Sequence, residues 1–545
     1  MENKNNSNED KVLFSGFDNV VELKIPEWNQ NMVKAIENSP LYKSSLNTTN
    51  ISKASKMVKL ETSISTNGWD TVSICRVSAL NALIKAEKTY PDQIDTSEPG
   101  YNFSVKGSFD AWQVVTGGDG KNVKIRVPFK DGFYKGLSYY GKDVFDITGS
   151  YADILLKLQY FPLPETTLTD GEYNLYVNTE GATSTEPIAA VINFEVTNCD
   201  MDDVNKSILK GQIEKWLNIP ENLKKFDTLF STVIINNMGQ GSEEFKWLNP
   251  TTIGYAYTDA NTEDSSIFGI LCMTNDRSSA GLPNQLPAIT LKEDDNSIFV
   301  ISRELFVKYK LLPSLPEIFK NSPDAKYTLS KDGLTINATN LKLDPISYKG
   351  STYYPVADSF EISFDSEFIR TTSNISCSLP FGIVSHSLIV AKQTLVMAKN
   401  NKGEKVMAYQ TVGKPDINNS VTIPPGVIIT ELISAILGGV FIGVAAWFGG
   451  AVLALIVGII VLLVVAIMVI SIHVIIAKII AEGVLESVPS IEPMVKLSSK
   501  KIKWPFCSEG GIDLTNIDYS GALVFEGNLA IKESFCIKAG KLISA

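Results

Sequence analysis

The chain has 545 residues, of which 44% are hydrophobic and 20% are charged, and its formal net charge at pH 7 is -11. A chain of this length is expected to form about two to four domains. The acidic balance argues against a general nucleic-acid-binding protein, which would present a basic face, and against non-specific attachment to an anionic membrane. The only histidines are His386 and His473, so a histidine-based catalytic or metal site is not expected.

The six cysteines are scattered along the chain, with no CxxC pair and no zinc-site spacing. This distribution favours buried free thiols over disulfides. The N-terminal sequence MENKNNSNEDKV is polar and acidic and has no apolar core, so no classical secretory signal is predicted. If the protein leaves its cell, it is expected to do so by lysis or by another route.

The N-terminal third begins with a polar extension, predicted over residues 1–56, which contains one apolar patch at 14–28. A helix is predicted over 69–88, because Trp69 and later apolar residues recur there at helical spacing. These later residues include Val72, Cys75, Ala79 and Leu83.

Strand patterns follow this helix, at 102–115 and 122–129 and again up to residue 196. The intervening Gly117-Gly118-Asp119-Gly120 lacks the Lys-Ser/Thr of a phosphate-binding loop and lies between two strands, so a hairpin turn is predicted. An amphipathic helix is predicted over 202–217.

A second cycle of strands and a helix begins near residue 229. The helix is predicted over 303–319 and carries Phe306, Tyr309 and Leu312, with Pro313 and Pro316 expected to kink or end it. A meander of alternating strands follows over 327–412. The pattern predicts an α+β protein with two units, 57–225 and 226–545, each a long apolar helix wrapped by a curved antiparallel sheet.

One block, Leu432 to Ala477, contains no Asp, Glu, Lys or Arg. Gly449-Gly450 divides the surrounding segment into two predicted helices, which form an apolar hairpin over 427–482. Each helix would exceed the ~30 Å thickness of a bilayer's hydrocarbon core. The small residues Gly439 and Gly443 would let the helices approach closely, and Trp447 lies near the turn.

The flanks of this hairpin carry no adjacent cluster of Lys or Arg, and Glu431 and Glu482 bracket it. A helix that is apolar on all sides can also form the buried centre of a large domain. Three alternatives stay open: a stable membrane span, a conditionally inserting hairpin, and a hairpin buried in a soluble fold.

No pattern indicates catalysis. The chain has no GxSxG nucleophile elbow, and His386 is expected to lie in or beside a strand. The acidic residues at 293–295 are typical of a solvated loop. The segment 259–264 lacks the glycine and terminal glutamate of a calcium-binding EF-hand. These patterns therefore indicate no catalytic site, no metal site and no cofactor.

Several short motifs, in a specific order, carry a resemblance to a known family. They begin with Thr66-Asn67-Gly68-Trp69-Asp70-Thr71-Val72, Phe109 to Val123, and Val127-Pro128. They continue with Ser266 to Thr274, Phe299 to Phe306, and Leu311-Leu312-Pro313. In these segments the chain resembles the TULIP-like accessory proteins of clostridial neurotoxin gene clusters, the OrfX-type family, and the resemblance runs from about Thr66 to the C-terminus.

The resemblance implies tubular lipid-binding units, binding of a lipid or other amphiphile, no enzyme activity, and service to a toxin. It further implies a bacterial cytoplasmic protein that is released with a toxin complex and can contact membranes. Candidate lipid-lining residues are the inward faces of the two predicted helices: Val72, Cys75, Ala79, Leu83, Phe306, Tyr309 and Leu312. The alternative function is a pore-forming or anchored toxin component that inserts hairpin 427–482. A third possibility is a purely structural partner of a toxin complex.

Overall fold

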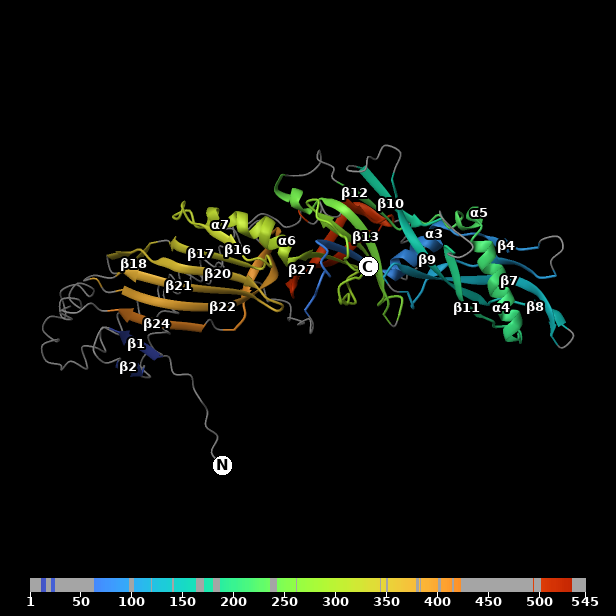
Figure 1. Cartoon of the computed structure of the whole chain (residues 1–545), viewed down its shortest axis with the longest axis horizontal. Coiled ribbons are helices and arrows are strands. Elements are labelled where there is room, and N and C mark those ends of the chain that lie inside the picture. Colours follow the sequence, from blue (N-terminus) through green and yellow to red (C-terminus); the bar gives the residue numbers. More distant parts are fainter. Residues whose placement is uncertain are drawn as a thin grey trace, which may run out of the picture. The chain divides into compact units, whose positions relative to one another are not determined.

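Figure 1 shows the computed structural model of the chain. The structure describes residues 11–15, 21–24, 63–97, 102–422, 494 and 501–531, with short gaps at 119, 140–141, 163–170, 180–186, 236–242, 261, 344, 349–350, 379–381, 383, 400–402 and 414–415. The chain divides into two compact units. Unit 1 comprises residues 1–63, 303–491 and 517–521, and unit 2 comprises residues 64–302, 492–516 and 522–545.

The boundaries of these two units differ from those of the predicted units 57–225 and 226–545. The boundary near 226 falls inside unit 2, and the chain returns to unit 2 after it has passed through unit 1. Strand pairing explains the return, because β15 (Ser297–Ser302) has β27 (Ala522–Ile531) as an antiparallel neighbour.

The smaller sheet of unit 2 has six strands in the order β13-β14-β3-β15-β27-β26. Every residue of β14 and of β15 is buried, as expected for strands that are covered on both faces. The remaining bounds are β3 (Thr71–Arg76), β13 (Pro250–Thr258), β14 (Ile267–Thr274) and β26 (Cys507–Tyr519), of which residues 517–519 belong to unit 1.

The larger sheet of unit 2 has the order β25-β12-β10-β9-β7-β5-β4, with β11 beside β9 and with β6 and β8 beside β7. The predicted hairpin turn lies between β6 and β7, which pair antiparallel. The strands are β4 (Gln93–Asp95), β5 (Ser104–Phe109), β6 (Gln113–Val114), β7 (Asn122–Tyr139), β8 (Lys142–Asp146), β9 (Tyr151–Pro162), β10 (Gly171–Val177), β11 (Ala189–Glu195), β12 (Ser231–Ile235) and β25 (Ile502–Lys503).

The helices of unit 2 that lie within the described residues are short. They are α3 (Val77–Glu87), α4 (Asp203–Leu217), α5 (Pro220–Leu223) and the 3-10 helix η1 (Glu243–Leu248). The prediction over 202–217 is confirmed by α4, whose first turn is capped by the Asp202 side chain. Trp216 of α4 packs against Phe109 of β5, with ring centroids 5.8 Å apart.

The prediction of one helix over 69–88 is wrong in its first half. Residues 71–76 form strand β3, and only 77–87 are helical. The sequence Thr71-Val72-Ser73-Ile74 is rich in β-branched residues, which suit a strand, and β3 gains backbone hydrogen bonds from β14 on one side and from β15 on the other. These tertiary pairings override the helical spacing of the apolar residues.

Unit 1 contains a nine-stranded sheet in the order β16-β17-β20-β21-β22-β24-β1-β2, with β23 beside β22. The strands are β1 (Lys11–Ser15), β2 (Val21–Lys24), β16 (Tyr327–Leu329), β17 (Thr335–Lys342), β20 (Val356–Phe364), β21 (Ile369–Ser378), β22 (Val384–Lys399), β23 (Lys405–Thr411) and β24 (Asp416–Thr422). A separate pair is formed by β18 (Ile346–Tyr348) and β19 (Ser351–Tyr353). The predicted N-terminal extension thus contributes two strands, of which β1 pairs with β24 in parallel.

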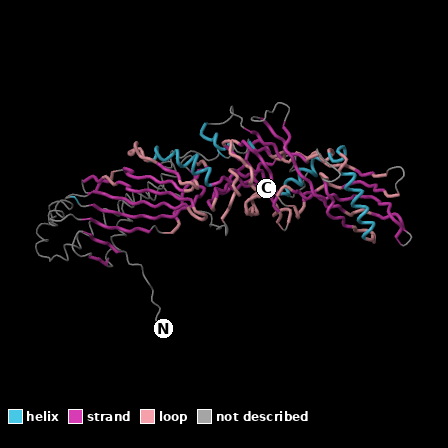
Figure 2. The backbone as a smooth tube through the Cα atoms, in the orientation of Figure 1, coloured by secondary structure: helices cyan, strands magenta, loops and turns pink. Residues whose placement is uncertain are grey.

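The predicted helix over 303–319 is confirmed as one helical segment with an irregular centre. It consists of α6 (Arg303–Phe306), the π-helix η2 (Val307–Leu311) and α7 (Leu312–Ile318), which contains Pro316. Strands dominate both units (Figure 2). Among the described residues the longest regular α-helix is α4, with 15 residues. The described part of the chain therefore contains more sheet and shorter helices than two units built on long wrapped helices would have.

Candidate functional site

The candidate lining residues of unit 2 do not share one face. Val72 and Cys75 are fully buried on β3, and strand residues an odd number apart point to opposite sides of a sheet. Val72 lies opposite Leu271 and Val300, whereas Cys75 lies opposite Phe268 and Ser297. The prediction that Val72, Cys75, Ala79 and Leu83 lie on the inward face of one helix is therefore wrong for Val72 and Cys75. Their role in lining a lipid-binding groove stays a prediction.

Ala79 and Leu83 do share the buried side of α3, as their four-residue spacing predicts. The same helix is fixed to β6 by Asn81. Its side-chain oxygen accepts from the Val114 amide at 2.7 Å, and its side-chain nitrogen donates to the Val114 carbonyl at 2.9 Å. These contacts make α3 a packed support of the sheet in unit 2.

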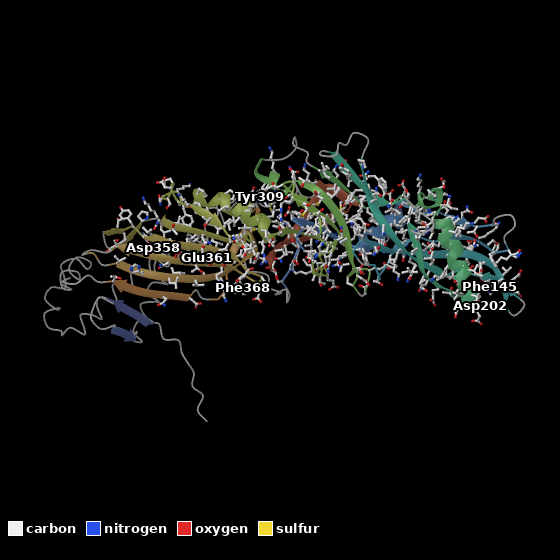
Figure 3. All side chains as sticks on the ribbon, viewed as in Figure 1. Phe145, Asp202, Tyr309, Asp358, Glu361 and Phe368 are labelled. Atoms are coloured by element: carbon white, nitrogen blue, oxygen red, sulfur yellow. The ribbon has the colours of Figure 1, made fainter. Side chains whose placement is uncertain are left out.

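The three candidates in unit 1 are distributed over the helical segment. Phe306 is buried and its ring contacts that of Phe364 on β20, with centroids 6.1 Å apart. Tyr309 and Leu312 are half-buried. Figure 3 labels Tyr309 on this segment, beside the strands of unit 1. Phe306 thus anchors the helical segment on the sheet through its ring.

The helical segment covers one face of the unit 1 sheet at β20. Phe306 contacts Phe364, and Phe319 contacts Phe360 with ring centroids 5.2 Å apart. Residues directly opposite one another in neighbouring strands point to the same side of a sheet. The register therefore extends this face from β20 to β21, where Phe360 lies opposite Ser373.

The same face continues onto β22, where every second residue from 385 to 395 is buried. Opposite pairs across β21 and β22 are Ile369 with Gln393, Thr371 with Ala391, Ser373 with Ile389, Ile375 with Ser387, and Cys377 with Ser385. We call the buried residues of β21 and β22 in these pairs the inner face of unit 1. Its residues are apolar or uncharged polar.

Three polar atoms of the inner face have no hydrogen-bond partner within the described structure: the hydroxyls of Ser385 and Ser387 and the side-chain nitrogen of Gln393. All three residues are at most 1% exposed. Such groups are rare in folded proteins, because each loses its hydration without compensation. Sequence reasoning missed them, although the alternation Ser385, Ser387, Ile389, Ala391, Gln393 along a strand was a visible signal.

The motif Thr66 to Asp70 forms a corner of unit 2. The Asp70 carboxylate is fully buried, accepts hydrogen bonds from the amide and hydroxyl of Thr274 at 2.8 and 3.1 Å, and pairs with Arg277. Trp69 donates its indole N–H to the carbonyl of Pro283 at 2.8 Å. These contacts tie the start of β3 to the segment after β14, so the motif has a structural role.

A second buried acid, Asp153 on β9, accepts from Arg126 at 2.8 and 3.1 Å and pairs with Lys124 at 3.2 Å. Burial raises the pKa of Asp153, but the hydrogen bonds and charges of Arg126 and Lys124 outweigh it and hold this pKa below its usual value. Arg126 also lies over the Tyr151 ring at 3.9 Å. The negative charge of Asp153 is therefore compensated by two cationic side chains.

The described residues contain no group of three or more His, Cys, Asp or Glu side chains placed to hold a metal ion. The buried Cys75, Cys272 and Cys377 are free thiols, as predicted. Burial raises the pKa of the Cys272 thiol to about 12 and that of Cys377 to about 11. These thiols are protonated at neutral pH and are therefore weak nucleophiles.

The hairpin 427–482, with Gly439, Gly443, Trp447, Gly449 and Gly450, lies outside the described residues. Within the described ranges, no helix combines the length and the apolar character needed to cross a bilayer. The alternatives for the hairpin thus stay predictions.

Comparison with solved structures identifies the fold. The chain is similar to P47 from Clostridium botulinum A2, with a TM-score of 0.58 and 18% identity, over 86% of this chain and 98% of that one. It is also similar to P47 of Clostridium botulinum E1, with a TM-score of 0.54 and 17% identity, over 85% of this chain and 100% of that one. The sheet-rich architecture is thus similar to that of P47.

Sequence comparison adds the family. The profile of the OrfX-like family, described as Protein OrfX2/OrfX3/P47, matches residues 66–527. Protein OrfX3 of Paraclostridium bifermentans is 28% identical over 506 residues, which cover 86% of this chain and 99% of that protein. Protein P47 of Clostridium botulinum, strain Kyoto / Type A2, is 21% identical over 309 residues, 55% of this chain and 69% of that protein.

The chain belongs to the OrfX-like family. The predicted resemblance to the OrfX-type family of clostridial toxin gene clusters is thereby confirmed.

Proposed function

We propose that the protein is a non-enzymatic accessory component of a bacterial toxin system that binds a lipid or another amphiphile. In this proposal the units act as tubular, TULIP-like binding modules, and the toxin or related accessory proteins are further partners. The inner face of unit 1 carries the proposal. It combines apolar side chains with buried polar atoms that the described protein does not satisfy.

The inner face has the composition that an amphiphile site requires. Apolar side chains such as Ile375 and Ile389 suit hydrocarbon, and a few polar groups can fix the orientation of a ligand. Phe306 lies at the edge of this face through its contact with Phe364. Among the predicted lining residues, Phe306 is therefore the one that we include in the proposed amphiphile site.

The first test is the native mass of the full chain purified without detergent, followed by release and identification of bound molecules. We expect a monodisperse species that carries lipid. A protein that is monodisperse and free of any bound amphiphile, and that takes up none from mixed vesicles, would contradict the proposal.

A bulky side chain at the centre of the inner face tests the location. Ala391 is fully buried there, and Ala391→Trp should lower the bound lipid several-fold by occupying its place. If Ala391 instead packs against protein, overpacking should cost about 1–3 kcal/mol of stability. The matched control is Leu388→Trp on the same strand, because Leu388 is 43% exposed. A folded Ala391→Trp protein with unchanged lipid content would exclude this face.

A second candidate function is suggested by the uncharged block from 432 to 477: a membrane-inserting toxin component that uses hairpin 427–482. Deletion of 427–482 should then abolish membrane association and leakage of liposomes. A deletion variant that folds, as judged by the same unfolding profile in circular dichroism, and still permeabilises liposomes would exclude this function.

A further inference from the structure

We propose that the inner face of unit 1 selects an uncharged amphiphile with hydroxyl or ester groups, bound by Ser385, Ser387 and Gln393. This inference rests on the proposed function and names the class of ligand. An acylglycerol is the simplest member of that class.

The hydrogen-bonding capacity of these residues is the first argument. Each serine hydroxyl can donate one hydrogen bond and accept others, and the side-chain nitrogen of Gln393 can donate two. The other end of the Gln393 amide is occupied, because its oxygen accepts from the Thr371 hydroxyl at 3.1 Å. The amide orientation is therefore fixed, and its N–H groups remain available to an acceptor such as a carbonyl oxygen.

The absence of charge is the second argument. None of the inner-face residues, as paired across β21 and β22, is charged. Charged residues of neighbouring strands lie on the other side: Glu361 alternates with the buried Phe360 and Ile362, and Asp358 accepts from Ser376, whose neighbours Ile375 and Cys377 are buried. Figure 3 labels both acids on this sheet. Burial of an anionic headgroup without a cation would cost far more than burial of a hydroxyl or an ester.

The spacing is the third argument. Ser385 and Ser387 are two residues apart on β22, and Gln393 is six residues further along the strand. At ~3.3 Å per residue the second serine and Gln393 are about 20 Å apart. The apolar Ile389 and Ala391 lie between them on the same face. This order of polar, apolar and polar positions fits a ligand with hydrocarbon between separated polar contacts.

The experiment uses the delipidated full chain and three probes with the same oleoyl chain, titrated below their aggregation concentrations and followed by native mass spectrometry. The probes are 1-monooleoylglycerol, oleate and oleoyl-lysophosphatidylglycerol. The first is uncharged, and the other two carry an anionic group. We expect the wild-type protein to bind monooleoylglycerol at least about tenfold more tightly than either anion.

Two variants test the residues. Ser385→Ala combined with Ser387→Ala, and separately Gln393→Leu, should each weaken monooleoylglycerol binding by roughly fivefold per lost hydrogen bond, with little effect on oleate. Ser359→Ala is the matched control, because Ser359 is an exposed serine on β20, and it should bind as the wild type does. The lipid-free serine variant should unfold at the same temperature as the wild type or at a higher one, since it loses buried hydroxyls without a partner.

The outcomes separate this inference from the function on which it rests. If the protein binds the anions as tightly as monooleoylglycerol, or if the variants bind like the wild type, the inference is wrong and the proposed function stands. If no probe binds and the purified protein carries no lipid, both fail. A clear drop in the unfolding temperature of the lipid-free serine variant would show that the hydroxyls are bonded within the protein, which also overturns the inference.

Discussion

Buried acids of unit 2 differ in how their charge is compensated. The Asp153 carboxylate has two cationic partners, and its pKa is held below the usual value. Asp295 is also buried, but its side chain accepts from the hydroxyl of Thr515 at 2.7 Å, and Glu526 lies near it. Burial, with a smaller contribution from Glu526, raises the pKa of Asp295. The pKa values of these two buried aspartates are therefore shifted in opposite directions.

Asp295→Asn should stabilise the protein increasingly as pH rises. A carboxyl with a raised folded pKa stabilises the fold below its unfolded pKa of about 3.9, and this contribution is lost as pH rises through the folded value. Asparagine cannot ionise and can still accept from Thr515. Urea unfolding at pH 4 and pH 7 measures the difference, and the exposed neighbour substitution Asp294→Asn is the control. An equal effect of Asp295→Asn at both pH values would contradict this reasoning.

Among the elements, β7 shows how glycine permits close strand contact. Gly107 of β5 lies opposite Gly132 of β7, where φ is +157°. A Cβ atom at Gly107 would lie 2.5 Å from the carbonyl oxygen of Asp131 and 2.9 Å from the Cα of Gly132. Both neighbours are backbone atoms, which cannot rotate away as a side chain can.

Gly107→Ala should therefore destabilise unit 2 by roughly 1–3 kcal/mol, the range of an overpacked site. The matched control is Gly211→Ala in α4, because nothing lies within 4 Å of a Cβ there, and it should stabilise by roughly 0.5–1 kcal/mol through helix propensity. Urea denaturation of the two variants tests the pair. Equal stability changes in the two would show that the β5–β7 contact is more adaptable than its geometry indicates.

At the scale of the whole molecule, unit 2 is completed by a segment distant in sequence. β27 pairs with β15 over six residue pairs, from Ser297–Gly527 to Ser302–Ala522. Lys292 also pairs with Glu526 of β27, a glutamate that is 2% exposed on its side chain. β27 is thus an internal strand of the six-stranded sheet, between β15 and β26.

Truncation after residue 499 should therefore destabilise unit 2, because β15 would lose β27, one of its two neighbouring strands. Limited proteolysis should show rapid cleavage within 64–302, with a loss of cooperative unfolding. The control is a variant that lacks residues 1–56. Because β1 and β2 lie at the end of the unit 1 sheet, unit 2 should stay folded in this variant. Protection of unit 2 in the truncated chain would refute its dependence on β27.

Local patterns and motifs in the amino-acid sequence were sufficient to predict the family, the helices at 202–217 and 303–319, the strand-rich class and the buried thiols. They were not sufficient to predict that 71–76 is a strand, because its hydrogen-bond partners come from β14 and β15, about 200 residues away in sequence. Only the tertiary structure decided the membership of the two units and the inner face with Ser385, Ser387 and Gln393. Which side chains share a buried face depends on strand register, and register is set by long-range pairing.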